Sequence, residues 1–267
     1  MLPVCKELLL ELDTGVLHVT LNRPHKRNAM NSLLVQELID VVRSIADDRT
    51  VRVIVLRGAE GNFCAGGDIS GMNQEGQAGK EASWEFNRSF GTMIAALNRA
   101  PQLVICLLEG AVLGGGFGLA CVSDLAIADE QSMFAMPETG LGIIPAQIAP
   151  FVVARVGITQ ARQLALFGKR INGKEAQQIG VAHEVVNGPE ELDKALAFAL
   201  KLASKAAPNA TAATKSLLLD VDETLVIESI LDRAADDFTA AITSEEGLEG
   251  TRAFVEKRNP AWAAKQP

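Results

Sequence analysis

The sequence predicts an α/β fold, in which a core of alternating strands and helices precedes a helical C-terminal region. Two segments, 51–58 and 103–110, are apolar on both faces, as are central strands of a sheet that helices cover on both sides. Strand and helix patterns alternate up to about residue 190, which favours an α/β core. Only helical patterns follow. We therefore expect a core over residues 1–190 and a helical region over 191–267.

The first elements are a hairpin and a helix. Apolar residues alternate with others over 8–12 and again over 17–21, and Asp13-Thr14-Gly15 between them favours a turn. Asn31-Ser32 then offers a helix cap, and apolar residues follow at helical spacing as far as Ile45.

The later elements follow the two buried strands. A polar, glycine-rich stretch near 72–80 predicts a loop, and the apolar spacing over 86–97 predicts a helix. Residues 123–130 predict a short strand, and residues 151–156 lie in a predicted helix.

Composition and charge argue against several classes of function. The net charge of −8 over 267 residues argues against nucleic acid as the main partner, because phosphate binding needs a clustered basic surface. The apolar run that begins at Leu103 is broken by Glu109 and is too short to span a membrane, and no secretion signal is found. The four cysteines form no Cys-x-x-Cys pair, and the three histidines lack metal-ligand spacing. We expect a reduced, cytoplasmic protein without a metal or a membrane partner.

Two glycine-rich turns follow the buried strands, and together they suggest an oxyanion hole. The first is Ala65-Gly66-Gly67-Asp68, and the second is Gly114-Gly115-Gly116. A glycine turn at the start of a helix leaves backbone N–H groups free. One such donor stabilises a transition state by roughly 2.7–4 kcal/mol. Close helix–strand packing also selects glycine. For either turn taken alone, packing remains an open alternative explanation of the glycines. Motifs of P-loop proteins and serine hydrolases are absent.

Glu138, in MPETG, is the best acid/base candidate by position. It lies in a largely uncharged stretch between Phe134 and Phe151, directly after Pro137. A carboxylate in such surroundings has a raised pKa and can transfer protons. A helix-cap acceptor and an ordinary ion pair are the open alternatives.

Four motifs together resemble the enoyl-CoA hydratase (crotonase) superfamily in order and spacing. They are LNRPHKRNAM (21–30), NFCAGGDI (62–69), EGAVLGGGFGLACVSD (109–124) and PETGLGIIP (137–145). The resemblance covers about residues 5–260. It implies a ClpP/crotonase-like spiral of ββα units, whose helical C-terminal region builds trimers, usually paired into hexamers. It also implies an acyl-coenzyme A thioester as substrate. Coenzyme A is then part of the substrate, and no other cofactor is implied.

The resemblance also implies the site residues. Gly67 and Gly115 match the two oxyanion-hole donors, and Glu138 matches an active-site acid. The positions that match coenzyme A contacts are Ala65 and Ile69 on the adenine side, with Arg27, near Ala29, and Lys257 at the phosphates. In the family, the C-terminal lysine can come from a neighbouring subunit.

The chain departs from the best-known hydratases at Gly118. Those enzymes carry two glutamates, and Gly118 takes the place of the first. A finer resemblance, in GGGFGLACVSD, PETGLGIIPAQIAPFVVARVG and EGTRAFVEKRNPAW, is to the isohexenylglutaconyl-CoA hydratases of acyclic terpene catabolism, for which glycine at this position is normal. The 3-methylglutaconyl-CoA hydratases are also similar.

The expected reaction is the hydration of a 2-enoyl-CoA thioester, with Glu138 as acid and base. A Δ3,Δ2-enoyl-CoA isomerase that uses Glu138 alone is the main alternative. A non-catalytic relative that binds acyl-CoA or RNA is a third hypothesis, and the acidic charge weakens its RNA version.

A branched glutaconyl substrate needs a partner for its free carboxylate. Gln147 follows Glu138 in the same stretch and is a candidate to bind water or that carboxylate; capping of the following helix is its alternative role. Arg88 and Arg155 are further candidates for the carboxylate.

Overall fold

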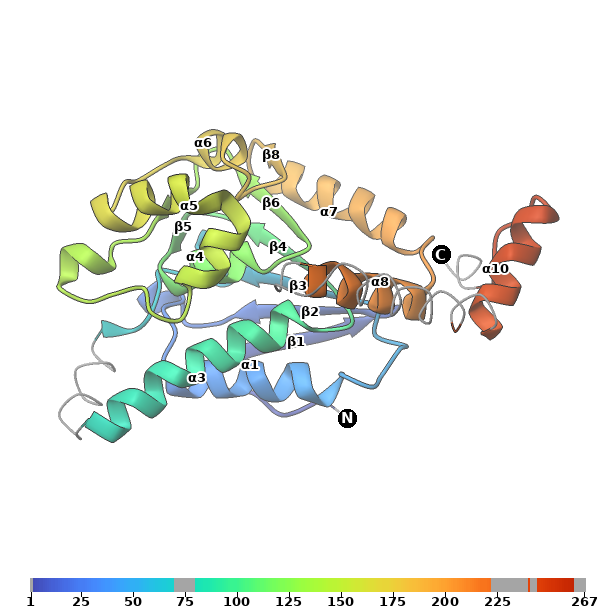
Figure 1. Ribbon diagram of the computed structural model, residues 1–267, viewed down its shortest axis with the longest axis horizontal. Coiled ribbons are helices and arrows are strands. Elements are labelled where there is room, and N and C mark those ends of the chain that lie inside the picture. The colour runs from blue at the N-terminus through green and yellow to red at the C-terminus, as the bar shows by residue number, and fades with distance from the viewer. Residues whose placement is uncertain (1, 70–79, 222–239, 241–243, 262–267) are drawn as a thin grey trace.

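A six-stranded sheet forms the centre of the protein, for which a computed structural model describes residues 2–69, 80–221, 240 and 244–261 (Figure 1). The strand order is β1-β2-β3-β4-β6-β8, and only the β1–β2 pair is antiparallel. The strands are β1 (Leu8–Asp13), β2 (Val16–Leu21), β3 (Val53–Gly58), β4 (Leu103–Leu108), β6 (Leu125–Asp129) and β8 (Glu184–Val186).

A second, smaller sheet makes the central strands part of a repeated unit. Strands β5 (Ala111–Leu113) and β7 (Met133–Ala135) pair in parallel, and Cys64 adds a bridge to Val112. Each of β3, β4 and β6 is therefore followed by a short stretch in the second sheet and then by a helix. These helices are α3 (Lys80–Asn98), α4 (Gly115–Cys121) and α5 (Ala149–Phe167). The predicted spiral of ββα units is confirmed.

Different helices cover the two faces of the large sheet. On one face, Ile54 and Leu56 of β3 join a core with α1 (Ser32–Ser44) and α3. On the other face, Val53 and Val55 pack with α7 (Pro189–Ala203). Burial on both faces explains why β3 is apolar at successive positions, as predicted.

The predicted hairpin, first helix and buried strands are confirmed. The side chain of Asn31 caps α1 by accepting the Leu34 N–H at 2.9 Å. The helix predicted around 151–156 extends to Phe167, with a positive φ of 72° at Gly157. The loop predicted near 72–80 lies outside the described residues, apart from Lys80 in α3.

Further helices complete the chain after α5. They are α6 (Gly173–Gln178), α7, α8 (Pro208–Val221) and α10 (Glu245–Val255). Helix α10 lies at the far end of the molecule from α4 and α5 (Figure 1). None of the described helices is long and apolar enough to cross a membrane. The described residues also hold no group of three or more side chains suited to a metal ion.

Candidate active site

The second glycine turn forms the N-terminus of α4. Gly114 joins β5 to this helix with a φ of 48° and a ψ of −115°, a conformation that only glycine adopts readily. The Gly118 N–H donates to the Gly114 carbonyl at 3.0 Å and so makes the first backbone hydrogen bond of α4. The N–H of Gly115 precedes this bond and has no acceptor within the helix. A free donor with the helix dipole behind it is thus available at this turn.

The first glycine turn lies against the second, backbone to backbone. A Cβ atom at Gly66 would lie 3.3 Å from the Leu113 carbonyl oxygen, and one at Gly114 would lie 3.6 Å from the Gly66 Cα. The Met30 N–H donates to the Gly66 carbonyl at 2.8 Å, and the Asp68 N–H donates to the Met30 carbonyl at 2.8 Å. The Gly67 N–H lies between these two bonds, and the described residues offer it no acceptor.

Close packing also operates at both turns. A Cβ atom at Gly116 would lie 2.7 Å from Cys64 Cβ, and one at Gly115 would overlap Met30 Cε. The two explanations of the glycines are therefore compatible, because tight contact between the turns brings their free donors close to each other.

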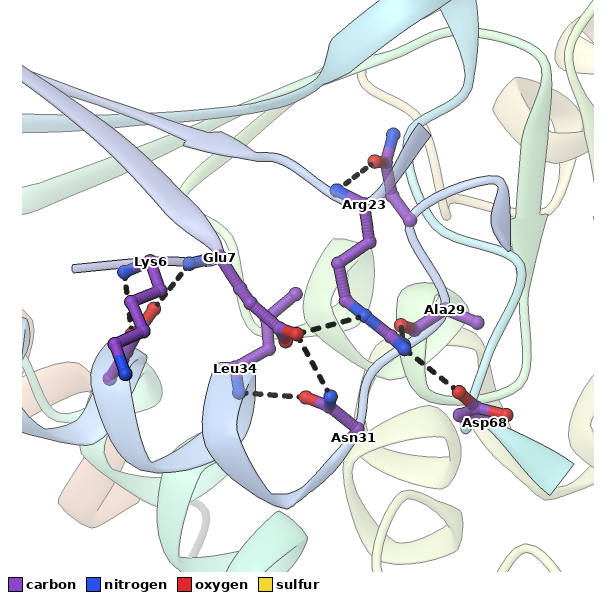
Figure 2. Close-up of polar contacts among 9 residues, drawn as sticks. Lys6, Glu7, Arg23, Ala29, Asn31, Leu34 and Asp68 are labelled. Carbon is purple, nitrogen blue, oxygen red and sulfur yellow. Dashed lines mark hydrogen bonds and ion pairs between the residues drawn. The ribbon is translucent and has the colours of Figure 1, made fainter. Parts of the chain in front are cut away.

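A buried ion pair holds the first turn in place (Figure 2). Arg23 Nη2 donates to the Asp68 carboxylate at 2.9 Å, and Arg23 Nη1 donates to the Ala29 carbonyl. The Glu7 carboxylate lies 3.3 Å from Arg23 Nε. Arg23 is 7% exposed and Asp68 is 8% exposed. One buried cation thus joins the segment before Ala29 to the residue that follows Gly67. The pairing of Arg23 with Asp68 was not predicted from the sequence.

The Glu138 carboxylate approaches these turns from a third element. Glu138 is the first residue of the 3-10 helix η3 (Glu138–Leu141). A Cβ atom at Gly114 would lie 2.8 Å from Glu138 Oε1. Glu138 Oε2 is buried, and no described residue forms a hydrogen bond with it.

Burial sets the proton affinity of this carboxylate. Desolvation raises the pKa of Glu138, and a hydrogen bond from its own backbone N–H opposes the shift. No neighbouring charge contributes to the shift, and η3 begins without a side-chain cap. Within the described part of the chain, Glu138 is thus neither an ion-pair partner nor a helix cap. A buried carboxylate with a raised pKa suits proton transfer.

The position of Gly118 is filled by apolar side chains from two other elements. A Cβ atom at Gly118 would overlap Ile148 Cγ2 and would lie 3.2 Å from Ile94 Cδ1. Ile94 is fully buried and Ile148 is 5% exposed. A side chain at position 118 would require Ile148 to move. Of the carboxylates that the described residues place at the two turns, Asp68 is paired with Arg23, whereas no neighbouring charge acts on Glu138.

Gln147 joins the start of α5 to α3. Its Nε2 donates to Asn87 Oδ1 at 2.9 Å. The N-cap residue of α5 is Ile148, and no side chain caps this helix. The helix-capping alternative for Gln147 is therefore wrong. Asn87 was not predicted either, because it follows Phe86 on a helix with no marked polar motif.

The two arginine candidates differ in their surroundings. The Arg155 guanidinium donates to the backbone carbonyls of Ser123, Gly180 and Val181 at 2.9–3.1 Å, so its donors already hold the backbone together. Arg88 is exposed on α3, one residue after Asn87. Arg88 Nη1 and Gln147 Oε1 are the two side-chain atoms nearest to the point where a Cβ at Gly91 would be, so Arg88 lies close to Gln147.

The positions expected to contact coenzyme A fall into two groups. Arg27, Ala29 and Ala65 lie together, because the Ala65 N–H donates to the Arg27 carbonyl at 3.0 Å. Ile69 follows Asp68 directly and is 45% exposed. Lys257 is exposed just after α10, and α10 lies at the far end from α4 (Figure 1). Within one chain, the fold does not bring Lys257 to the other positions.

Comparison with known proteins gives a family and several relatives. The family model described as enoyl-CoA hydratase/isomerase matches residues 11–265. The 2,3-dehydroadipyl-CoA hydratase of Escherichia coli K12 is 33% identical over 95% of this chain and 97% of its own length. The 1,2-epoxyphenylacetyl-CoA isomerase of the same organism is 30% identical over 97% of this chain and 98% of its own. Among solved structures, Pseudomonas aeruginosa AtuE is 53% identical with a TM-score of 0.95, covering 97% of this chain and 100% of its own.

Proposed function

The chain belongs to the enoyl-CoA hydratase/isomerase family, and on this premise we propose that it adds water to a 2-enoyl-CoA thioester. One observation carries the proposal. The Glu138 carboxylate has a buried oxygen without a partner among the described residues, and it lies against two glycine turns with free N–H donors. This arrangement supplies a base, an acid and an oxyanion hole in one place.

In the proposed reaction, the two turns polarise the thioester while Glu138 moves the proton. The N–H groups of Gly67 and Gly115 donate to the thioester carbonyl oxygen. Glu138 takes a proton from water as the hydroxide adds to the β-carbon, and the enolate charge rests on the carbonyl oxygen. Glu138 then returns the proton to the α-carbon, so water is added and the carboxylate is regenerated. General acid–base catalysis of this kind contributes about 10²–10⁴-fold to the rate.

A second candidate is a Δ3,Δ2-enoyl-CoA isomerase, and the surroundings of Gly118 favour it. Ile148 and Ile94 fill the place where two-glutamate hydratases carry an acid. One carboxylate suffices to move a proton between C2 and C4 of the acyl chain, with the same two N–H donors on the enolate. A relative named as a 1,2-epoxyphenylacetyl-CoA isomerase shows that isomerases of acyl-CoA thioesters also occur in the family.

For the substrate, we propose a branched glutaconyl-CoA thioester of the isohexenylglutaconyl-CoA type, with 3-methylglutaconyl-CoA as the smaller alternative. The motifs around Gly118 and Glu138 and the C-terminal motif support this choice through their resemblance to those hydratases. A relative named as a 2,3-dehydroadipyl-CoA hydratase shows that enoyl-CoA substrates with a second carboxyl group occur in the family.

Assembly and location complete the proposal. We propose that the helical region over 191–267 assembles a homotrimer, or a hexamer of two trimers, and that Lys257 reaches the coenzyme A phosphates of a neighbouring subunit. The four cysteines are free thiols, which fits a reducing cytoplasm. The reaction needs no cofactor beyond the coenzyme A of its substrate.

Product analysis in ¹⁸O-labelled water separates the two reactions. The protein is incubated with 3-methylglutaconyl-CoA and, separately, with a 3-enoyl-CoA. We expect a labelled 3-hydroxyacyl-CoA from the first thioester. Migration of the double bond in the second thioester, with no label taken up from either, would replace the hydratase by the isomerase.

A further inference from the structure

We propose that Asn87, Arg88 and Gln147 form a recognition site for a second carboxylate on the acyl group, an inference that rests on the proposed hydration. Asn87 and Arg88 are neighbours on α3, whereas Gln147 lies in the segment before α5, 60 positions after Asn87. The Gln147 amide and the Arg88 guanidinium lie over Gly91 of α3, the helix whose Phe90 and Ile94 lie against Gly115 and Gly118.

One face of α3 runs along the start of α4. Asn87, Phe90, Gly91 and Ile94 are spaced by three and four residues and so share this face. The Phe90 ring lies 3.9 Å from the point where a Cβ at Gly115 would be, and Ile94 reaches the corresponding point at Gly118. Asn87 therefore lies about one helical turn from the ring that touches the proposed oxyanion hole.

The donors at this place match the chemistry of a carboxylate. Gln147 Nε2 is engaged with Asn87 Oδ1, which leaves the Asn87 Nδ2 group as a donor. Arg88 Nη1 donates to Thr92 Oγ1 at 3.2 Å, and this bond holds the guanidinium along α3. The planar fork of arginine binds carboxylates through paired hydrogen bonds. The neutral amide of Asn87 thus supplies a directed hydrogen bond, and the Arg88 cation supplies the opposite charge.

Gly91 gives these two side chains room over α3. A glycine in a helix interior costs roughly 0.5–1 kcal/mol relative to alanine. A Cβ atom at Gly91 would overlap Gln147 Oε1 and would lie 2.9 Å from Arg88 Nη1. The absence of a side chain at Gly91 therefore lets the Gln147 amide and the Arg88 guanidinium lie over the same point of α3.

The spacing suits a short dicarboxylic chain. A five-carbon enoyl diacid has four carbon–carbon bonds of about 1.5 Å between its two carboxyl carbons. Three residues of helix rise about 4.5 Å, which is the step from Phe90 back to Asn87. The two lengths are comparable, so a glutaconyl group with its thioester carbonyl at Gly115 and its acyl chain along α3 reaches the level of Asn87 and Arg88.

The test compares two thioesters that differ only in the far group. These are 3-methylglutaconyl-CoA and 3-methylpent-2-enoyl-CoA, in which a methyl replaces the carboxylate. We expect Arg88→Leu to lower the ratio of kcat/KM for the diacid to that for the monoacid by roughly 10- to 100-fold, mainly through KM for the diacid. Gly91→Ala is expected to lower the same ratio, and Arg88→Lys to restore part of it. Arg162→Leu, at an exposed position on α5, is the control and leaves the ratio unchanged.

Binding of unreactive analogues separates this inference from the proposed hydration. We expect the wild-type protein to bind glutaryl-CoA more tightly than pentanoyl-CoA by calorimetry, and Arg88→Leu to lose that preference while keeping its affinity for pentanoyl-CoA. Equal wild-type affinities, or a preference that survives in Arg88→Leu, would overturn the carboxylate site. If the protein prefers glutaryl-CoA but hydrates neither enoyl thioester, the proposed hydration is overturned, whereas the proposed carboxylate site is retained.

Discussion

Ile148 occupies the space into which a side chain at Gly118 would project, since a Cβ atom there would overlap Ile148 Cγ2. This contact joins α4 to the segment that carries Gln147. Apolar packing thus fills the position next to Gly118, and Glu138 is the carboxylate that we propose carries the proton.

The contact predicts that Gly118 does not tolerate even a methyl group. We expect Gly118→Ala to lower the free energy of unfolding by about 1–3 kcal/mol, as overpacking of a core does. Urea denaturation of the two proteins measures the change. Gly140→Ala is the matched control, because nothing lies within 4 Å of a Cβ there. Equal losses at both positions would show that Ile148 does not constrain Gly118.

The Arg23–Asp68 pair predicts a coupled loss of stability and turnover. Asp68→Asn removes one of the two carboxylates beside the buried Arg23 and leaves Glu7 as the other, so we expect it to lower the free energy of unfolding by about 1.5–3 kcal/mol. We also expect kcat to fall more than KM changes, because the Gly67 N–H loses its fixed direction. Lys174→Gln removes an exposed pair with Glu130 and is expected to cost at most about 1 kcal/mol. A kcat unchanged in folded Asp68→Asn would contradict this positioning role.

The raised pKa of Glu138 predicts how stability varies with pH. The folded protein binds this proton more tightly than the unfolded chain, so its contribution falls as the pH rises from the ordinary carboxyl value of 4.5 through the raised value. We expect Glu138→Gln to be more stable than wild type at pH 7, and this difference to shrink towards pH 4. Denaturation curves at the two pH values measure it. A difference that is constant with pH would mean that burial does not shift this carboxyl group.

The same shift predicts the acid limb of the rate profile. Hydration needs the ionised base, so kcat/KM is expected to rise with pH through a pKa above 4.5. This limb is expected to be absent from whatever turnover remains in Glu138→Gln. A limb that persists unchanged in the variant would assign it to another group.

Local features of the site are visible in the sequence, whereas its long-range contacts are not. The glycine turns and Glu138 could be predicted, because positive φ angles select glycine and a carboxylate in an apolar stretch is conspicuous. The Arg23–Asp68 and Asn87–Gln147 contacts join residues 45 and 60 positions apart, and such pairs leave no periodic pattern. The strands β5 and β7 were not predicted, because three residues are too few to show an alternating apolar pattern.

Turnover of Glu138→Gln with 3-methylglutaconyl-CoA tests the central claim most directly. The amide keeps the shape of the side chain but cannot accept and return the proton. Glu184→Gln, at an exposed position on β8, is the matched control, and denaturation curves confirm that both variants fold. We expect kcat to fall by at least about 10²-fold in Glu138→Gln and to stay at the wild-type value in the control. A kcat within about threefold of wild type in Glu138→Gln would contradict the assignment of Glu138 as the acid and base.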